Sequence, residues 1–131
     1  MEPARDGADG PKLVPHLEAI DFQHLARMTL GEQHLEAEVL RLFDQQARVL
    51  LAHMRACSPE AAAAFAHTLR GSATGIGAWR VAAAAGAVER QASSRAGAGI
   101  AEAVSRLAAA IEEARAAIAH QLEASKLEQN G

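Results

Sequence analysis

The chain of 131 residues has no tyrosine, one tryptophan, three phenylalanines and a single cysteine. One cysteine cannot form an intramolecular disulfide, so we expect a cytoplasmic protein in which Cys57 is a small apolar residue near a helix end. No apolar run approaches the roughly 18 residues of a membrane-spanning helix, and the opening stretch MEPARDGADGPK lacks the apolar core of a signal peptide. Long β-branched or aromatic runs are also missing, which disfavours a sheet. These absences predict an all-α protein that does not contact a membrane.

Alanine, by contrast, is abundant, and half of the residues are hydrophobic. Alanine has the highest helix propensity and lets neighbouring helices approach closely. The formal net charge of −3 gives no basic excess, so a nucleic-acid partner is not expected. A chain of this length forms one domain with one core. We expect that domain at residues 16–124, between a disordered tail at 1–15 and a frayed tail at 125–131.

Apolar residues at helical spacing predict five helices. Gly31 suits the C-terminal cap of the first helix, Ser58 and Pro59 suit the start of the third, and TGIGA at 74–78 suits a turn. SSRAGAG at 93–99 is interpreted as a flexible connection. The predicted helical ranges are 17–30, 32–56, 58 to 73 or 75, 78–93 and a last helix from 100. Short loops join the last four, which predicts an antiparallel up-and-down four-helix bundle with a short extra N-terminal helix.

The predicted core follows the apolar side of each helix. Its members, in chain order, are Ile20, Leu25, Met28, Leu35, Val39, Leu42, Phe43, Leu50, Met54, Phe65, Leu69, Ala73, Ile76, Val81, Ala85, Val88, Ala92, Ile100, Val104, Leu107, Ile111, Ile118 and Leu122.

The third predicted helix carries a lone histidine on the side away from its core. At about 100° per residue, His67 lies about 200° from both Phe65 and Leu69. A glycine inside a helix costs about 1 kcal/mol relative to alanine, yet Gly71 stands one turn after the histidine and leaves room for a large partner. Arg70 places a positive charge on the same side, able to hold phosphate oxygens. The residues that share this face with the histidine are Ala63, Arg70, Gly71 and Thr74.

The stretch AHTLRGSATGIGAWRVAAAAGAVE, residues 66–89, resembles the signature of histidine-containing phosphotransfer (HPt) domains. That signature has a histidine, an aliphatic residue, a Lys or Arg, a glycine, a run of small residues, and a glycine before the next helix. The corresponding residues here are His67, Leu69, Arg70, Gly71, the run 72–76 and Gly77. The predicted order of helices also matches, and the resemblance covers about residues 17–123.

The resemblance implies a role for each site residue. His67 is the expected phospho-acceptor, through Nε2, and Arg70 compensates phosphate charge where the family more often has Lys. Many members place Gln or Glu twenty-two positions after the histidine, where it bonds the other ring nitrogen and orients the imidazole. That position is Glu89, at the edge of the apolar stripe of the fourth predicted helix. The residues expected to form the docking opening are Ala63, Gly71 and Thr74.

Such a protein relays phosphate in a two-component phosphorelay between a hybrid sensor histidine kinase and the receiver domain of a response regulator. The Mg²⁺ of that chemistry belongs to the receiver, so no cofactor or metal is expected in this chain. The sequence has no GxxxxGK[ST] motif, and we therefore expect a phosphohistidine carrier without kinase or ATPase activity. We also expect a monomer.

The sequence also bears on three other functions. A helical adaptor that binds receiver or other signalling domains without accepting phosphate stays open as the alternative. A metal-binding bundle is disfavoured because none of the six histidines has a glutamate three positions before it and no HExxH occurs. The dimerisation domain of a histidine kinase is disfavoured because HTLRGSA lacks the acidic residue and the Arg-Thr-Pro run that follow the histidine there.

Overall fold

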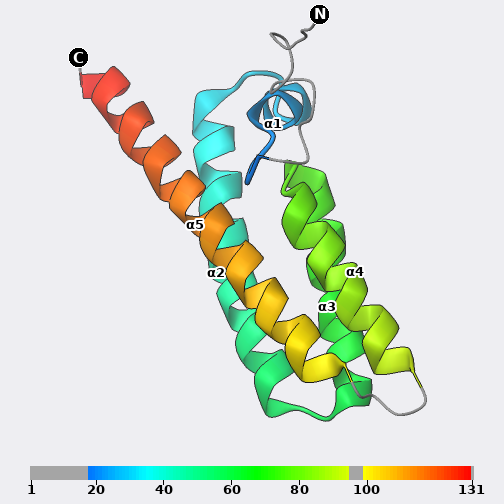
Figure 1. Cartoon of the computed structure of the whole chain (residues 1–131). Coiled ribbons are helices and arrows are strands. Elements are labelled where there is room, and N and C mark those ends of the chain that lie inside the picture. Colours follow the sequence, from blue (N-terminus) through cyan, green and yellow to red (C-terminus); the bar gives the residue numbers. More distant parts are fainter. Residues whose placement is uncertain (1–17, 95–98, 131) are drawn as a thin grey trace, which may run out of the picture.

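The computed structural model describes residues 18–94 and 99–130, which form five helices and no strand (Figure 1). The helices are α1 Phe22–Met28, α2 Gln33–Ala56, α3 Pro59–Ile76, α4 Trp79–Ser93 and α5 Ile100–Asn130. The prediction of an all-helical protein is thereby confirmed for the described part of the chain. The predicted tail at 1–15, the connection at 95–98 and residue 131 lie outside the described residues.

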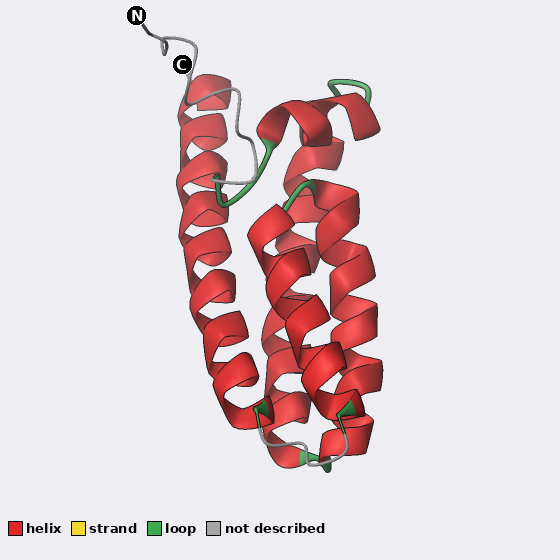
Figure 2. Cartoon of the chain, turned by 45° about the vertical axis from the view of Figure 1, so that its right-hand side comes forward, coloured by secondary structure: helices red, strands yellow, loops and turns green. Residues whose placement is uncertain are grey.

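The four long helices form a helical bundle (Figures 1 and 2). α3 packs against α2 and α4, and α5 also packs against α2 and α4. The short α1 contacts α3 and lies near the connection between α3 and α4. A single core therefore runs along the inside of the long helices, and α3 presents one side to the outside.

Small and branched apolar side chains fill the core. Alanines on several helices have no exposed surface, so the helices approach closely wherever an alanine stands at the interface. Most of the predicted core is confirmed, including every predicted member on the last helix except the half-buried Ile100 and Leu122. The fully or nearly fully buried members are Ile20, Leu25, Phe43, Met54, Leu69, Ala73, Ile76, Val81, Ala85, Val88, Val104, Leu107, Ile111 and Ile118.

The core face of α2 was predicted only in part. Leu35 and Leu42 are 47% and 56% exposed, whereas Leu40, Ala47 and Leu51 are buried. α2 carries large apolar residues on more than one of its sides, and packing against α3 and α5 decides which of these residues are covered. Ala47 was missed because a small side chain contributes little to an apolar stripe in the sequence.

The first helix is shorter than predicted. It begins at Phe22 because Asp21 is its N-cap, whose Oδ1 accepts a hydrogen bond from the backbone N–H of His24 at 3.1 Å. The buried Ile20 lies before the helix, and Met28 in its last turn is 59% exposed, contrary to the prediction. The helix ends at Met28, and its C-cap is Thr29 in place of the predicted Gly31.

Asp21 also ties the start of α1 to the connection between α3 and α4. Its Oδ2 accepts from Trp79 Nε1 at 3.1 Å, and its backbone N–H donates to Gly77 O at 2.8 Å. Gly77 has φ 84°, and a Cβ there would lie 2.9 Å from Asp21 O, so the close approach requires glycine. Burial raises the pKa of Asp21, but the hydrogen bonds from His24 and Trp79 and the nearby Arg27 outweigh it, and the pKa lies below its usual value.

Two other helix ends differ from the prediction. α3 continues through Ile76 to a left-handed cap at Gly77, so the predicted turn at 74–78 is confined to its last residues. α5 continues to Asn130, six residues past the predicted end of the domain at 124, so residues 125–130 are helical where a frayed tail was predicted.

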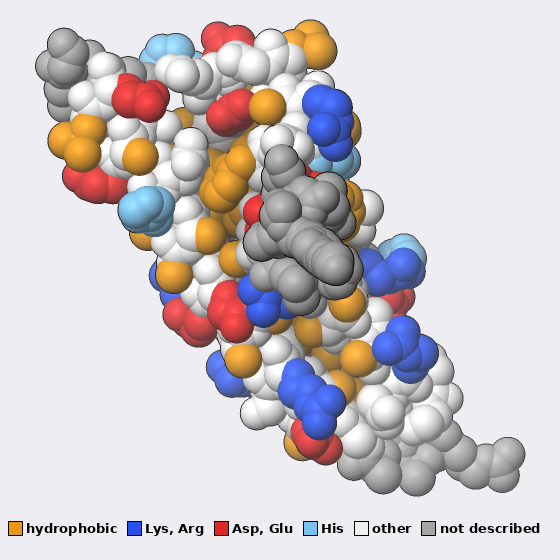
Figure 3. All heavy atoms as spheres, turned by 45° about the horizontal axis from the view of Figure 1, so that its top comes forward, with side chains coloured by type: hydrophobic (Ala, Val, Ile, Leu, Met, Phe, Trp, Pro, Cys, Tyr) orange, Lys and Arg blue, Asp and Glu red, His pale blue; other side chains and the backbone are white. Residues whose placement is uncertain are grey.

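The outer surface mixes charges of both signs. On the face in Figure 3, Lys and Arg side chains lie among Asp and Glu with apolar atoms between them. Within the described residues, no helix combines the length and apolar character that crossing a bilayer requires.

Candidate functional site

His67 lies in the middle of α3 with its side chain outside the bundle. Ala66 and Leu69 on either side are buried against the other helices, and the His67 side chain is 68% exposed. Gly71 and Thr74 are exposed on the same side, as predicted, and Ala63 is half-buried. Phe65, predicted to be core, is only half-buried.

Glu89 reaches this histidine from the neighbouring helix. Val81, Ala85 and Val88 face the core, which leaves Glu89 at the edge of α4 beside α3. His67 Nδ1 lies 2.9 Å from Glu89 Oε2, and the Glu89 side chain is 22% exposed. The two residues, twenty-two positions apart in sequence, are therefore in direct contact.

Arg70 completes the group. Its Nε donates to Glu89 Oε1 at 2.5 Å, and its Nη2 lies 3.2 Å from His67 Nδ1. Both oxygens of Glu89 are thus occupied, one by each partner. Partial burial raises the pKa of Glu89, but the hydrogen bonds and charges of Arg70 and His67 outweigh it, and the pKa lies below its ordinary value. Glu89 is consequently an anion at neutral pH.

The two contacts at His67 Nδ1 require different tautomers of the ring. An Nδ1–H donates to the carboxylate of Glu89, whereas Arg70 Nη2 can donate only to an Nδ1 that carries a lone pair. The contact to the carboxylate is shorter and pairs a donor with an ionised acceptor, so it is the stronger bond. It favours the tautomer with the proton on Nδ1, which leaves the lone pair of Nε2 free.

Gly71 has no packing reason to be a glycine. A Cβ built on it would meet no atom within 4 Å, other than its neighbours and its own helix backbone, and its φ is not in the left-handed region. Its missing side chain leaves the surface beside the imidazole clear at a cost to helix stability. The hydroxyl of Thr74 donates to Arg70 O at 2.8 Å, so Thr74 and Ala63 share the face without joining the hydrogen-bonded group of His67, Arg70 and Glu89.

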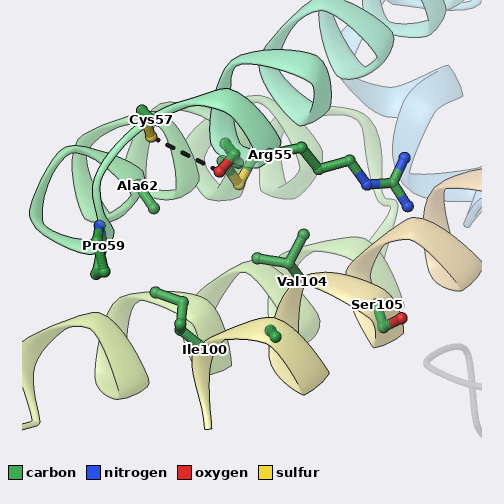
Figure 4. Close-up of a pocket in the computed structure, with 9 residues that line it drawn as sticks. Arg55, Cys57, Pro59, Ala62, Ile100, Val104 and Ser105 are labelled. Atoms are coloured by element: carbon green, nitrogen blue, oxygen red, sulfur yellow. Dashed lines mark hydrogen bonds between the residues drawn. The ribbon is translucent and has the colours of Figure 1, made fainter. Parts of the chain in front are cut away.

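A separate pocket of about 280 Å³ opens where the end of α2 and the starts of α3 and α5 meet (Figure 4). Pro59, Ala62, Ile100 and Val104 line it with apolar atoms, and the half-buried Cys57 lies at its edge. Cys57 Sγ lies 3.2 Å from Ser58 O and 3.7 Å from Met54 O, so the thiol has backbone carbonyl acceptors close to it in sequence. This pocket contains no residue of the His67 group.

One feature of the site was missed in the sequence. Gly86 and Arg90 stand four positions apart on α4, and the Arg90 side chain lies over Gly86 beside Arg70. The i, i+4 spacing on one helix face was the signal that could have revealed it. Within 18–94 and 99–130, no group of three or more His, Cys, Asp or Glu side chains is arranged to hold a metal ion.

Comparison with known proteins identifies no relative: no family model, curated protein or solved structure matches this chain.

Proposed function

We propose that the protein is a histidine phosphotransfer protein, which relays a phosphoryl group between receiver-domain aspartates in a two-component phosphorelay. The observation that carries this proposal is the 2.9 Å contact between His67 Nδ1 and Glu89 Oε2 on an otherwise exposed imidazole. A neutral imidazole oriented in this way is a good nucleophile near neutral pH. The resemblance of residues 66–89 to the HPt signature points to the same chemistry.

The reaction follows from the tautomer that Glu89 favours. The Nε2 lone pair attacks the phosphorus of an aspartyl phosphate on the receiver; the N–P bond forms while the P–O bond breaks, and its electron pair leaves with the aspartate. The proton on Nδ1 stays on the ring, and the cation that results is stabilised by the carboxylate of Glu89. The reverse step passes the group to the aspartate of a second receiver.

Arg70 and Gly71 serve the phosphoryl group and the partner. Arg70 is able to swing from Glu89 to the phosphoryl oxygens and balance part of their charge. Gly71, with Ala63 and Thr74, gives the receiver a close approach. The Mg²⁺ for the transfer is held by the receiver, and this chain supplies neither a nucleotide site nor a kinase activity.

The proposal also covers the topology of the helices, the location and oligomeric state of the protein, and its partners. We propose that α2–α5 form an antiparallel up-and-down four-helix bundle with α1 across one end. The protein acts as a cytoplasmic monomer whose partners are a hybrid sensor histidine kinase and a response regulator.

Incubation with a receiver domain carrying ³²P on its aspartate tests the function. The wild-type protein should acquire acid-labile label, His67→Gln should acquire none, and His34→Gln, which alters an exposed histidine on α2, should match the wild type. Label on His67→Gln, or no label on the wild type from any receiver of the source organism, would refute the proposal. Stable binding to a receiver without any label would instead identify the adaptor function.

A further inference from the structure

Gly86 on α4 is covered by two arginine side chains. A Cβ at Gly86 would lie 3.4 Å from Arg90 Nη1 and 3.6 Å from Arg70 Cδ. Arg70 comes from α3 and Arg90 from the next turn of α4, so the two cations converge on one point from different helices. The glycine provides the space that both side chains share.

An open hollow of about 600 Å³ surrounds this point. Its lining includes Arg70, Arg90 and Gly86, together with Glu89 and Ser93. His67 does not line the hollow. The position that a phosphoryl group on His67 Nε2 would take is therefore separate, since Nδ1 is the ring nitrogen that faces Glu89.

The charges around the hollow do not balance. Glu89 is the one carboxylate in the lining, and its two oxygens already bind Arg70 Nε and His67 Nδ1. Arg90 makes no hydrogen bond or ion pair with any residue in the described part of the chain. Two guanidinium groups thus face one carboxylate, and bringing a second cation beside the first is unfavourable unless an anion joins them.

The free donors are suited to oxyanions. All five N–H groups of Arg90 and the Nη1 group of Arg70 are uncommitted among the described residues. A guanidinium presents paired N–H groups that match the two oxygens of a carboxylate or phosphate. The hydroxyl of Ser93 already donates to Glu89 O at 3.0 Å, so the arginines supply the donors.

We propose that Arg70 and Arg90, converging over Gly86, form a binding site for an oxyanion presented by another molecule. The ligand is a carboxylate, such as an acidic side chain, or a phosphate group. The site adjoins the His67 face but is a second point of contact, and anion binding there does not require phosphorylation of His67.

NMR titration of ¹⁵N-labelled protein with inorganic phosphate, at constant ionic strength maintained with chloride, tests the site. We expect saturable shifts at the Gly86 amide and at the Nε–H signals of Arg70 and Arg90. Arg90→Gln should lose these shifts while the rest of its spectrum stays folded. Arg106→Gln, which removes an arginine paired with Glu102 on α5, should retain them. Shifts that persist in Arg90→Gln, or that chloride produces equally, would overturn the proposal.

Two further titrations identify the class of ligand and test this site independently of the proposed phosphotransfer. Shifts with acetate as well as phosphate support a site that accepts a carboxylate, and shifts with phosphate alone support a site for phosphate groups. Shifts with neither contradict the site. His67→Gln should bind phosphate as the wild type does, so a failure of phosphotransfer and a failure of anion binding are separate results.

Discussion

Replacing Gly71 by alanine should stabilise the protein while larger side chains at the same place impair transfer. A Cβ there meets nothing within 4 Å, so alanine adds no clash and removes the helix penalty of glycine. The free energy of unfolding should rise by about 0.5–1 kcal/mol, partly because the unfolded chain has less conformational freedom with alanine than with glycine at this position. For a protein of 131 residues, a gain of 1 kcal/mol corresponds to a Tm rise of about 4 °C.

The functional cost should appear only with a large partner. Gly71→Leu places a side chain beside His67 on the exposed face, and a loss of about 1.4 kcal/mol in docking would lower the transfer rate constant tenfold. We expect at least this decrease in kcat/KM with a phosphorylated receiver. Phosphorylation by phosphoramidate, a small donor that needs no docking surface, should proceed at the wild-type rate.

Gly75→Ala is the matched control, because Gly75 is also helical, exposed and without neighbours around its Cβ. It lies eight positions from His67, about 12 Å along the helix axis at 1.5 Å per residue. It should change transfer much less than substitution of Gly71. If Gly71→Ala destabilises the fold, the glycine is structural; if Gly71→Leu transfers from the receiver at the wild-type rate, the steric argument is wrong.

Three further predictions concern the tautomer of His67, the contacts that Asp21 makes at the start of α1, and the hydrophobic core. Arg70→Met removes the N–H that competes for His67 Nδ1, so imidazole ¹⁵N shifts should move toward the Nδ1–H tautomer; a move toward Nε2–H would contradict the assignment. Asp21→Asn leaves one oxygen for two donors and should cost about 1–2 kcal/mol at pH 7 by chemical denaturation. The lowered pKa of Asp21 stabilises the fold above about pH 3.9, and this stability is lost as pH falls through the folded pKa, so the variant should show a flatter acid dependence. Leu107→Ala, at a fully buried site on α5, should cost about 2–5 kcal/mol, and a cost below 1 kcal/mol would contradict its place in the core.

Arginine at position 70 gives the site a property that lysine would not. Its fork-shaped guanidinium contacts Glu89 through Nε and His67 through Nη2 at the same time, whereas a lysine has one nitrogen for both. The charge near the imidazole is thus coupled to the ring's tautomer. A partner that draws Arg70 away from Nδ1 would strengthen the contact between Nδ1–H and Glu89.

Local patterns were sufficient for much of the fold. The helical spacing of apolar residues predicted α4, the start of α5 and most of the buried residues of both helices, because apolar residues recur on one side of α4 and of α5 as far as Ile118. The start of α3 followed from Ser58 and Pro59, whose capping and backbone preferences act within a few residues. The outward direction of His67 followed from its angular separation from Leu69 on the same helix. Each of these features depends on interactions within one helix.

The order of amino acids alone is therefore enough to predict the set of helices and, except on α2, most of the apolar side of each long helix. Packing between helices decides which residues of α2 are covered, how Asp21 joins the start of α1 to the connection between α3 and α4, and how Arg90 and Arg70 meet over Gly86. The 2.9 Å contact between His67 and Glu89 likewise depends on how α3 and α4 pack, although the resemblance to a known signature had pointed to the pair. The physical reason is range: propensity, capping and periodicity act along one helix, whereas a contact between helices depends on the rotation and offset that packing of the whole core selects.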